Sequence, residues 1–282
     1  MNIAPPLRTA ALAAVPLLAA AHAAPVVSTF GPLRNRLMPR LSGRGRTNHI
    51  ALTFDDGPDP RSTPHFLRLL AGRGVHATFF LLGSEAHRSP GLVHEIAAAG
   101  HEVAVHGWLH RPLLLRGPLA TYDDFRRARD TVAAITGRQP SLFRPPYGVM
   151  STAAHLAARR LDLTPVLWTC WGEDWTARAT PHSVHRTVTA DLHGGGTILL
   201  HDSDCTSAPG AWRSALGAGR AAPDPRHLPG TGLRRRPTAR PRLTGTDAER
   251  GCRGFAMSAC ACRPARPLTT GSREEQPGCG PW

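Results

Sequence analysis

The sequence predicts an α/β domain in which helices cover a parallel β-sheet. Short apolar runs alternate with stretches of helical periodicity from about residue 49 to residue 202, and this alternation is typical of parallel sheets. Glycines lie where helix C-caps belong, at Gly100 and Gly137. Acidic and histidine side chains stand at the ends of several predicted strands, which is where the catalytic residues of a parallel barrel collect.

We expect six strands and five helices in this region. The strands are predicted at 49–54, 76–81, 102–106, 141–143, 164–168 and 197–201. The helices are predicted at 63–73, 86–99, 122–136, 151–161 and 181–192. Thr63 followed by Pro64 gives the first of these helices a capping residue and a proline in its first turn.

Residues 1–24 have the pattern of a secretory signal peptide. Arg8 supplies the positive charge, residues 10–20 the apolar run, and Ala21-His22-Ala23 a small-residue cleavage site. The apolar run is shorter than a membrane span. We therefore expect a secreted, extracellular monomer without membrane association after cleavage, with a retained N-terminal anchor as the alternative. Residues 25–47 are rich in proline and arginine and predict a linker.

The charge of the chain says little about its partners. The formal net charge is +14, and every basic residue other than histidine is arginine. Abundant alanine, glycine, proline and arginine indicate a GC-rich coding sequence, so we do not expect a nucleic-acid partner.

The C-terminal region, residues 218–282, differs in character from the rest. It is rich in arginine, proline, glycine and cysteine and lacks helical or strand periodicity. We interpret it as a frameshifted, non-native tail that leaves the last strand and helix of the domain incomplete. A natural disordered extension and a small disulfide-bonded module are the alternatives. The catalytic domain is then expected at residues 48–217.

Two adjacent carboxylates end the first predicted strand. Residues 50–54 are apolar or β-branched, and Asp55-Asp56 is followed by the chain-breaking pair Gly57-Pro58. One carboxylate of such a pair can bind a metal while the other remains free as a base. A solvated turn or a helix N-cap is the alternative for Asp-Asp-Gly alone.

Two histidines follow the third predicted strand. His106 and His110 are spaced so that a helix or tight loop presents both imidazoles on one side. Together with a carboxylate from another strand, they form a set of three ligands that leaves a position open, as in catalytic Zn²⁺ sites. Surface histidines are the alternative reading.

Three further segments carry polar groups at strand ends: Arg144-Pro145-Pro146-Tyr147, Asp174-Trp175 and Leu199-Leu200-His201-Asp202. The prolines after Arg144 stiffen the turn that it begins, so that Arg144 can be held beside a carboxylate and keep it ionised. His201 ends the last strand and can serve as a general acid if an aspartate fixes its tautomer. A solvent-facing arginine and a buried core histidine are the respective alternatives.

In order and spacing, five motifs resemble those of the polysaccharide deacetylases, also called carbohydrate esterase family 4 or the NodB-homology domain. The motifs are TFDDGP, HGWLH, RPPYG, EDW and LLHD, within residues 48–204. The resemblance implies a distorted (β/α)7 barrel. It also implies roles for individual residues: Asp55 as general base, His201 as general acid, Arg144 and Asp174 as their partners, Asp56, His106 and His110 as metal ligands, and Tyr147, Pro145, Trp175 and Leu199 as the substrate pocket.

This sequence departs from the family pattern at two positions. Gly107 stands where the family usually has a serine or threonine whose hydroxyl steadies the loop, so metal affinity is expected to be lower. Trp171 stands where many relatives have an acidic residue, which we interpret as variation in the groove.

The resemblance implies a secreted hydrolase that uses a divalent metal, Zn²⁺ by expectation, to remove N-acetyl groups from a carbohydrate polymer or oligomer of the chitin or peptidoglycan type, releasing acetate. Two alternatives remain open. One is an O-acetyl esterase acting on acetylxylan, and the other is an inactive carbohydrate-binding relative.

Overall fold

The computed structural model of the chain describes residues 5–207 and 209–221. Within them, seven strands form a sheet in the order β5-β4-β3-β2-β1-β7-β6. The strands are β1 Ala51–Asp55, β2 Thr78–Leu81, β3 Glu102–Val105, β4 Leu142–Phe143, β5 Thr164–Pro165, β6 Cys170–Trp171 and β7 Thr197–His201. Neighbouring strands are parallel throughout this sheet. The predicted α/β class is confirmed.

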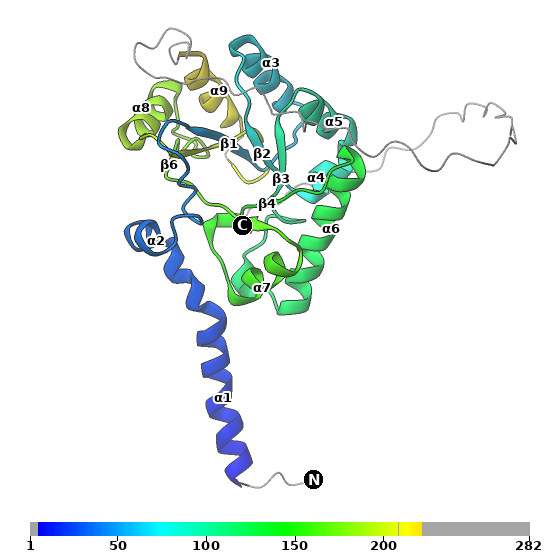
Figure 1. Cartoon of the computed structure of the whole chain (residues 1–282), viewed down its shortest axis with the longest axis vertical. Coiled ribbons are helices and arrows are strands. Elements are labelled where there is room, and N and C mark those ends of the chain that lie inside the picture. Colours follow the sequence, from blue (N-terminus) through cyan, green and yellow to red (C-terminus); the bar gives the residue numbers. More distant parts are fainter. Residues whose placement is uncertain (1–4, 208, 222–282) are drawn as a thin grey trace, which may run out of the picture. The chain divides into compact units, whose positions relative to one another are not determined.

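Most of the helices flank the central strands (Figure 1). The α-helices are α1 Pro5–Ala23, α2 Gly31–Leu37, α3 Thr63–Arg73, α4 Gly83–Arg88, α5 Pro90–Ala98, α6 Pro118–Thr136, α7 Thr152–Arg160, α8 Pro181–Asp191 and α9 Trp212–Ala221. The 3₁₀ turns are η1 Ala24–Thr29, η2 Leu113–Leu115 and η3 Pro146–Gly148. Helices α5 and α6 contact β3, whereas α8 contacts β6 and α9 contacts β7.

The sheet curls into a half-barrel around one buried arginine. Its end strands, β5 and β6, are joined by residues 166–169. The Arg144 side chain donates hydrogen bonds to the backbone carbonyls of Val166 and Leu167, each at 3.1 Å. The connecting segment is thereby tied to the interior of the half-barrel.

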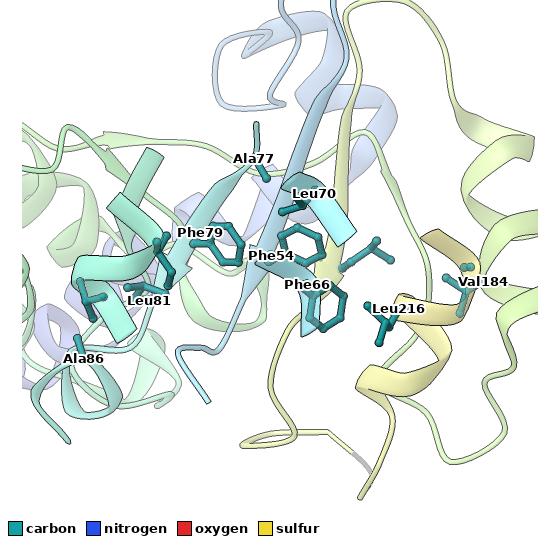
Figure 2. Close-up of a cluster of buried hydrophobic side chains, with 14 of the residues drawn as sticks. Phe54, Phe66, Leu70, Ala77, Phe79, Leu81, Ala86, Val184 and Leu216 are labelled. Atoms are coloured by element: carbon teal, nitrogen blue, oxygen red, sulfur yellow. The ribbon is translucent and has the colours of Figure 1, made fainter. Parts of the chain in front are cut away.

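Strand alternation separates the core from the inner face. Leu52, Phe54, Ile198 and Leu200 point to the outer face of β1 and β7 and join one apolar cluster, because side chains two apart share a face of a strand. Figure 2 shows part of this cluster, in which the rings of Phe54 and Phe66 lie 4.9 Å apart between centroids. The side chains at the intervening positions point to the inner face, and they include Thr53, Asp55, Leu199 and His201.

Two predicted elements are each divided in the structure. The helix predicted at 86–99 is two helices, α4 and α5, and the second begins at Pro90, whose ring suits a helix start but not a helix interior. The strand predicted at 164–168 ends at Pro165, and a further strand, β6, follows. The carbonyls of residues 166 and 167 bind Arg144 instead of a neighbouring strand.

The segment predicted as a linker, residues 25–47, contains η1 and α2. Its later part packs against the sheet region: Leu41 is buried and its carbonyl accepts the Leu167 amide at 2.8 Å. The Thr197 hydroxyl also donates to the Gly43 carbonyl at 2.6 Å. Among the described residues, no single helix is long and apolar enough to cross a membrane, although the bent pair formed by residues 14–29 and 31–37 meets those limits of length and composition.

Helix α9 extends further than the sequence suggested. We expected helical order to fail near residue 218, yet α9 continues to Ala221 with Ala218 buried. Gly217 lies against Pro181 of α8, where a Cβ atom would come within 2.6 Å of the proline ring, so the absence of a side chain permits close packing of the two helices. The frameshifted tail and its disordered and disulfide-bonded alternatives concern residues 222–282, which lie outside the described part of the chain.

Candidate functional site

The two adjacent aspartates occupy different environments at the end of β1. Asp55 is the last residue of the strand and points to the inner face. Asp56 leaves the strand with a φ of +75°, a region that asparagine and aspartate tolerate better than most residues. Both side chains are buried. The change of backbone conformation therefore gives the two carboxylates separate partners.

Asp55 is held by Arg144, as the resemblance implied. One terminal nitrogen of the Arg144 guanidinium donates to Asp55 Oδ1 at 2.7 Å and to the Thr53 hydroxyl at 2.8 Å. Arg144 is fully buried, and its guanidinium also lies 4.0 Å from the centroid of the Phe80 ring. Arg144 therefore fixes the position of the Asp55 carboxylate through a charge-assisted hydrogen bond.

Asp56 lies beside the two histidines that were predicted with it. Its Oδ1 atom is 3.3 Å from His106 Nε2 and 3.7 Å from His110 Nε2. The three candidate ligand atoms all lie within 4.8 Å of one another. The Oδ1 atom is buried without a hydrogen-bond partner among the described groups.

The donor set fits a divalent cation. The Arg144 carbonyl can only accept, so its 2.8 Å contact with His106 Nδ1 places a proton on that nitrogen. In the neutral ring, the lone pair of Nε2 then faces the Asp56 carboxylate. Two electron-rich atoms in this arrangement need a proton or a cation between them, and two imidazoles with one carboxylate are ligands typical of Zn²⁺.

Burial and neighbouring charges set the protonation states of these three residues. Burial lowers the pKa of His110 to about 4, so its ring is neutral and able to bind a metal at neutral pH. Burial alone would raise the pKa of Asp56, but the close contact with His106 and the charges of the neighbouring histidines lower it overall. Burial likewise opposes protonation of His106, yet the Asp55 and Asp56 carboxylates raise its pKa. A proton and a metal therefore compete for His106 Nε2.

His201 and Asp174 lie on the other side of Asp56. His201 Nδ1 is 3.0 Å from Asp174 Oδ1, and His201 Nε2 is 4.0 Å from Asp56 Oδ2. Burial alone would lower the pKa of His201, but the charge of Asp174 and its hydrogen bond raise that pKa to about 10. The imidazole is therefore protonated at neutral pH, with Nε2 directed toward the carboxylates.

Comparison with known proteins shows to which family the chain belongs. The sequence profile for polysaccharide deacetylase matches residues 42–166. The chitooligosaccharide deacetylase of Bradyrhizobium sp. (strain ANU 289) is 34% identical over 173 residues, which cover 61% of this chain and 77% of the relative. The chain belongs to the polysaccharide deacetylase family.

Other similar proteins are longer or differ more in sequence. The peptidoglycan-N-acetylglucosamine deacetylase PgdA of Listeria monocytogenes is 36% identical over 166 residues, 58% of this chain, but the match spans only 35% of the length of PgdA. The crystal structure of the Bc1960 peptidoglycan N-acetylglucosamine deacetylase superposes with a TM-score of 0.59 at 28% identity, covering 64% of this chain and 82% of that one.

The predicted pocket residues of this family member differ in exposure. Tyr147 is 57% exposed, and its ring meets that of His110 edge-on at 4.3 Å between centroids. Trp175 is 42% exposed and lies next to Trp171, at 6.3 Å between ring centroids. Pro145 and Leu199 are both buried. An aromatic side chain therefore stands exposed beside His110 and another beside Asp174.

Three neighbours of the candidate site were not singled out from the sequence. The Thr206 hydroxyl donates to Asp56 Oδ2. Thr53 shares Arg144 with Asp55, and its position two residues earlier on the same strand could have indicated this. Asp202, part of the LLHD motif, turns away from His201 and accepts a hydrogen bond from the Thr63 hydroxyl at 2.5 Å. The contacts of Thr206 and Asp202 join distant segments and leave no local pattern in the sequence.

Proposed function

We propose that this chain is a metal-dependent hydrolase that removes N-acetyl groups from an acetylated carbohydrate of the peptidoglycan or chitooligosaccharide type. The observation that carries the proposal is that a candidate base, Asp55, and a candidate acid, His201, both lie at the candidate metal site and each has its own hydrogen-bond partner. Asp55 accepts a hydrogen bond from Arg144, and its Oδ2 lies 3.8 Å from His106 Nε2. His201 is hydrogen-bonded to Asp174, and its Nε2 lies 4.0 Å from Asp56 Oδ2. A base and an acid on either side of a Lewis acid suit amide hydrolysis.

Asp56, His106 and His110 would hold the metal. A divalent cation such as Zn²⁺ supplies polarisation of an acyl oxygen and a lowered pKa for water. Asp55 takes a proton from the attacking water, and the hydrogen bond from Arg144 orients the Asp55 carboxylate for that transfer. The backbone N–H of Tyr147 is assigned to the developing oxyanion.

His201 completes the reaction as the general acid. Its Nδ1–H is directed to Asp174, which leaves the Nε2–H to be given to the departing amine. Water and the acetylated amine are thus converted into acetate and a free amine. The exposed rings of Tyr147 and Trp175 supply apolar walls for the acetyl group or the sugar.

We also propose that the protein is exported and acts as a monomer. The support for export is the charge, apolar run and small-residue site of residues 1–24. The match to PgdA covers about a third of that protein. The activity and substrate proposed for this chain therefore rest on its own residues and not on those of PgdA.

The test measures acetate release from N-acetylated chitooligosaccharides, peptidoglycan and acetylxylan in parallel. We expect release from the first or second substrate, loss of release on chelation, and recovery when Zn²⁺ is returned. The variant His106→Ala should lose stoichiometric Zn²⁺ and activity together, because one of three ligands is removed. Release from acetylxylan alone would support an O-acetyl esterase, and carbohydrate binding without release would support an inactive relative. A His106→Ala variant with full metal content and full rate would contradict the ligand assignment.

A further inference from the structure

The segment between the two candidate metal-binding histidines has a backbone that needs external support. Gly107 adopts a φ of +90°, which residues with a side chain rarely adopt. The segment therefore has no helical hydrogen bonds of its own to set the distance between His106 and His110. Groups from two neighbouring helices supply the missing contacts.

Helix α4 holds the carbonyl groups of this segment. The Gly83 amide donates to the Gly107 carbonyl at 2.9 Å, and the Ser84 amide donates to the Trp108 carbonyl at 3.0 Å. Both donors belong to the first turn of α4, where amides have no partner within the helix. The carbonyl groups of Gly107 and Trp108 thus both accept hydrogen bonds from backbone amides of α4.

Helix α6 contacts a backbone amide of the same segment through the Asp124 carboxylate. Asp124 Oδ2 accepts the Trp108 backbone N–H at 2.7 Å. The Asp124 side chain is only 5% exposed, and its Oδ1 atom lies 3.3 Å from the guanidinium of Arg116. Burial raises the pKa of Asp124, while the Trp108 amide and the charge of Arg116 oppose that shift. The carboxylate thus accepts backbone hydrogen bonds from Trp108 and Leu109 in the segment and has a separate partner for its charge.

The Trp108 side chain fixes the same position from another direction. The guanidinium of Arg127, also on α6, lies 3.7 Å from the centroid of the indole ring. A Cβ atom on Gly83 would come within 2.6 Å of that ring, so the indole packs directly on α4. The position of Trp108, midway between the two histidines, is therefore determined by both helices.

We propose that Asp124 is a positioning residue for the metal site, acting through the Trp108 amide to set the placement of His110 relative to His106. Asp124 also occupies the space beside residue 107, because a Cβ atom on Gly107 would come within 3.1 Å of Asp124 Oδ2. A carboxylate from α6 thus supports the segment where this sequence has no hydroxyl at residue 107. The inference rests on the proposed metal site.

The experiment compares two neutral replacements of similar size. Asp124→Asn keeps an oxygen that can accept the Trp108 N–H, whereas Asp124→Leu keeps the volume and removes the acceptor. Both variants remove the negative charge that pairs with Arg116. The difference in Zn²⁺ affinity between them therefore reports the loss of the hydrogen-bond acceptor. The control is Asp123→Asn, because Asp123 is the preceding residue of α6 and its side chain is 66% exposed.

The principal measurement is the affinity of the metal-free proteins for Zn²⁺ alone, by competition with a chromogenic chelator. Removal of such a supporting contact typically weakens metal binding by about 10–100-fold. We expect a loss of that size for Asp124→Leu, a change of a few fold at most for Asp124→Asn, and none for Asp123→Asn. Equal affinities for the Leu and Asn variants would overturn the inference.

A second measurement covers the case in which Asp124→Leu does not fold. Hydrogen exchange of the Trp108 amide should be slow in the wild-type protein and in Asp124→Asn. Exchange as fast as that of an exposed amide in both proteins would overturn the proposed hydrogen bond. A wild-type protein without Zn²⁺ affinity would instead refute the metal site itself, which distinguishes failure of the proposed function from failure of this inference.

Discussion

One carboxylate, that of Asp174, holds His201 at two points. Asp174 Oδ2 accepts the His201 backbone N–H at 2.7 Å, and Asp174 Oδ1 lies 3.0 Å from His201 Nδ1. The first contact fixes the backbone at the end of β7 and the second fixes the orientation of the ring. Asp174 is 1% exposed, so its negative charge acts on the imidazole with little screening by water.

The pH dependence of turnover should change when Asp174 is replaced. With the pKa of His201 raised to about 10, the acid form is present through neutral pH and is lost only as the pH rises toward that value. Asp174→Asn removes the negative charge, so the alkaline limb of the rate profile should move to lower pH. Turnover at neutral pH should fall by about 10²-fold or more. Acetate release measured across pH is the test, and an unmoved alkaline limb would contradict the role of Asp174.

Stability should depend on pH through the same pair. The pKa of His201 is raised on folding from an ordinary value of 6.5 to about 10. The contribution of the pair is therefore complete below about pH 6.5 and is lost as the pH rises through the folded value. Urea unfolding between these limits should show a decline in the wild-type protein that is smaller in Asp174→Asn. Parallel declines in the two proteins would assign the effect to other groups.

The two adjacent aspartates should have separable functions. Asp55→Asn removes the proposed base without removing a proposed ligand, so Zn²⁺ binding should persist while turnover falls by about 10²–10⁴-fold. Asp56→Asn should instead weaken Zn²⁺ binding, because Asp56 Oδ1 is the oxygen nearest both histidines. Metal content and acetate release measured on both variants decide the matter. The reverse pattern would show that the two assignments are exchanged.

Replacement of Arg144 should destabilise the fold as well as the site. Arg144→Met leaves Asp55 as a buried charge without its cation and removes hydrogen bonds to the carbonyls of Val166 and Leu167. Loss of one partner of a buried pair typically costs about 3–5 kcal/mol. Chemical denaturation should show a loss of this size in the free energy of unfolding. Arg61→Met, which removes an exposed pair with Asp59, is the control and should change that free energy by about 1 kcal/mol or less.

The outer face of the sheet should be sensitive to cavities. Phe66 on α3 is 1% exposed and packs against Phe54 of β1 (Figure 2). Phe66→Ala should lower the free energy of unfolding by about 3–5 kcal/mol. Leu119→Ala on α6 is a matched control because Leu119 is 80% exposed. A loss in Phe66→Ala no larger than in the control would show that the cluster does not carry the stability assigned to it.

Most strand positions could be predicted because they depend on local periodicity. The apolar runs ending at Asp55 and His201 are strands β1 and β7, and they pair in parallel with these two residues opposite one another. The ends of adjacent parallel strands meet at one edge of the sheet, so polar residues at those ends come together. The division at Pro90 was also present in the sequence, but the apolar period across it suggested a continuous helix.

Other features could not be predicted from local patterns. Strand β6 has two residues, too few to show a period, and it exists because it pairs with β7. The contact between Asp124 and the Trp108 amide joins α6 to a segment 16 residues earlier. The hydroxyl of Thr206 reaches an aspartate 150 residues away. Long-range contacts of this kind follow from how the half-barrel closes rather than from the residues beside them.

The sequence by itself determined the α/β class, through local strand and helix periodicity, and the five ordered motifs, whose family resemblance implied the candidate ligands, base and acid. The tertiary structure alone decided the geometry of the site and the contacts, such as that of Thr206 with Asp56, that no motif implied. The turn at Asp56, with its φ of +75°, directs that carboxylate to His106 and His110 while Asp55 remains with Arg144. The physical reason is that strand periodicity fixes the face of a residue within a strand, whereas beyond the strand end the direction of a side chain depends on the backbone turn and on the groups packed around it.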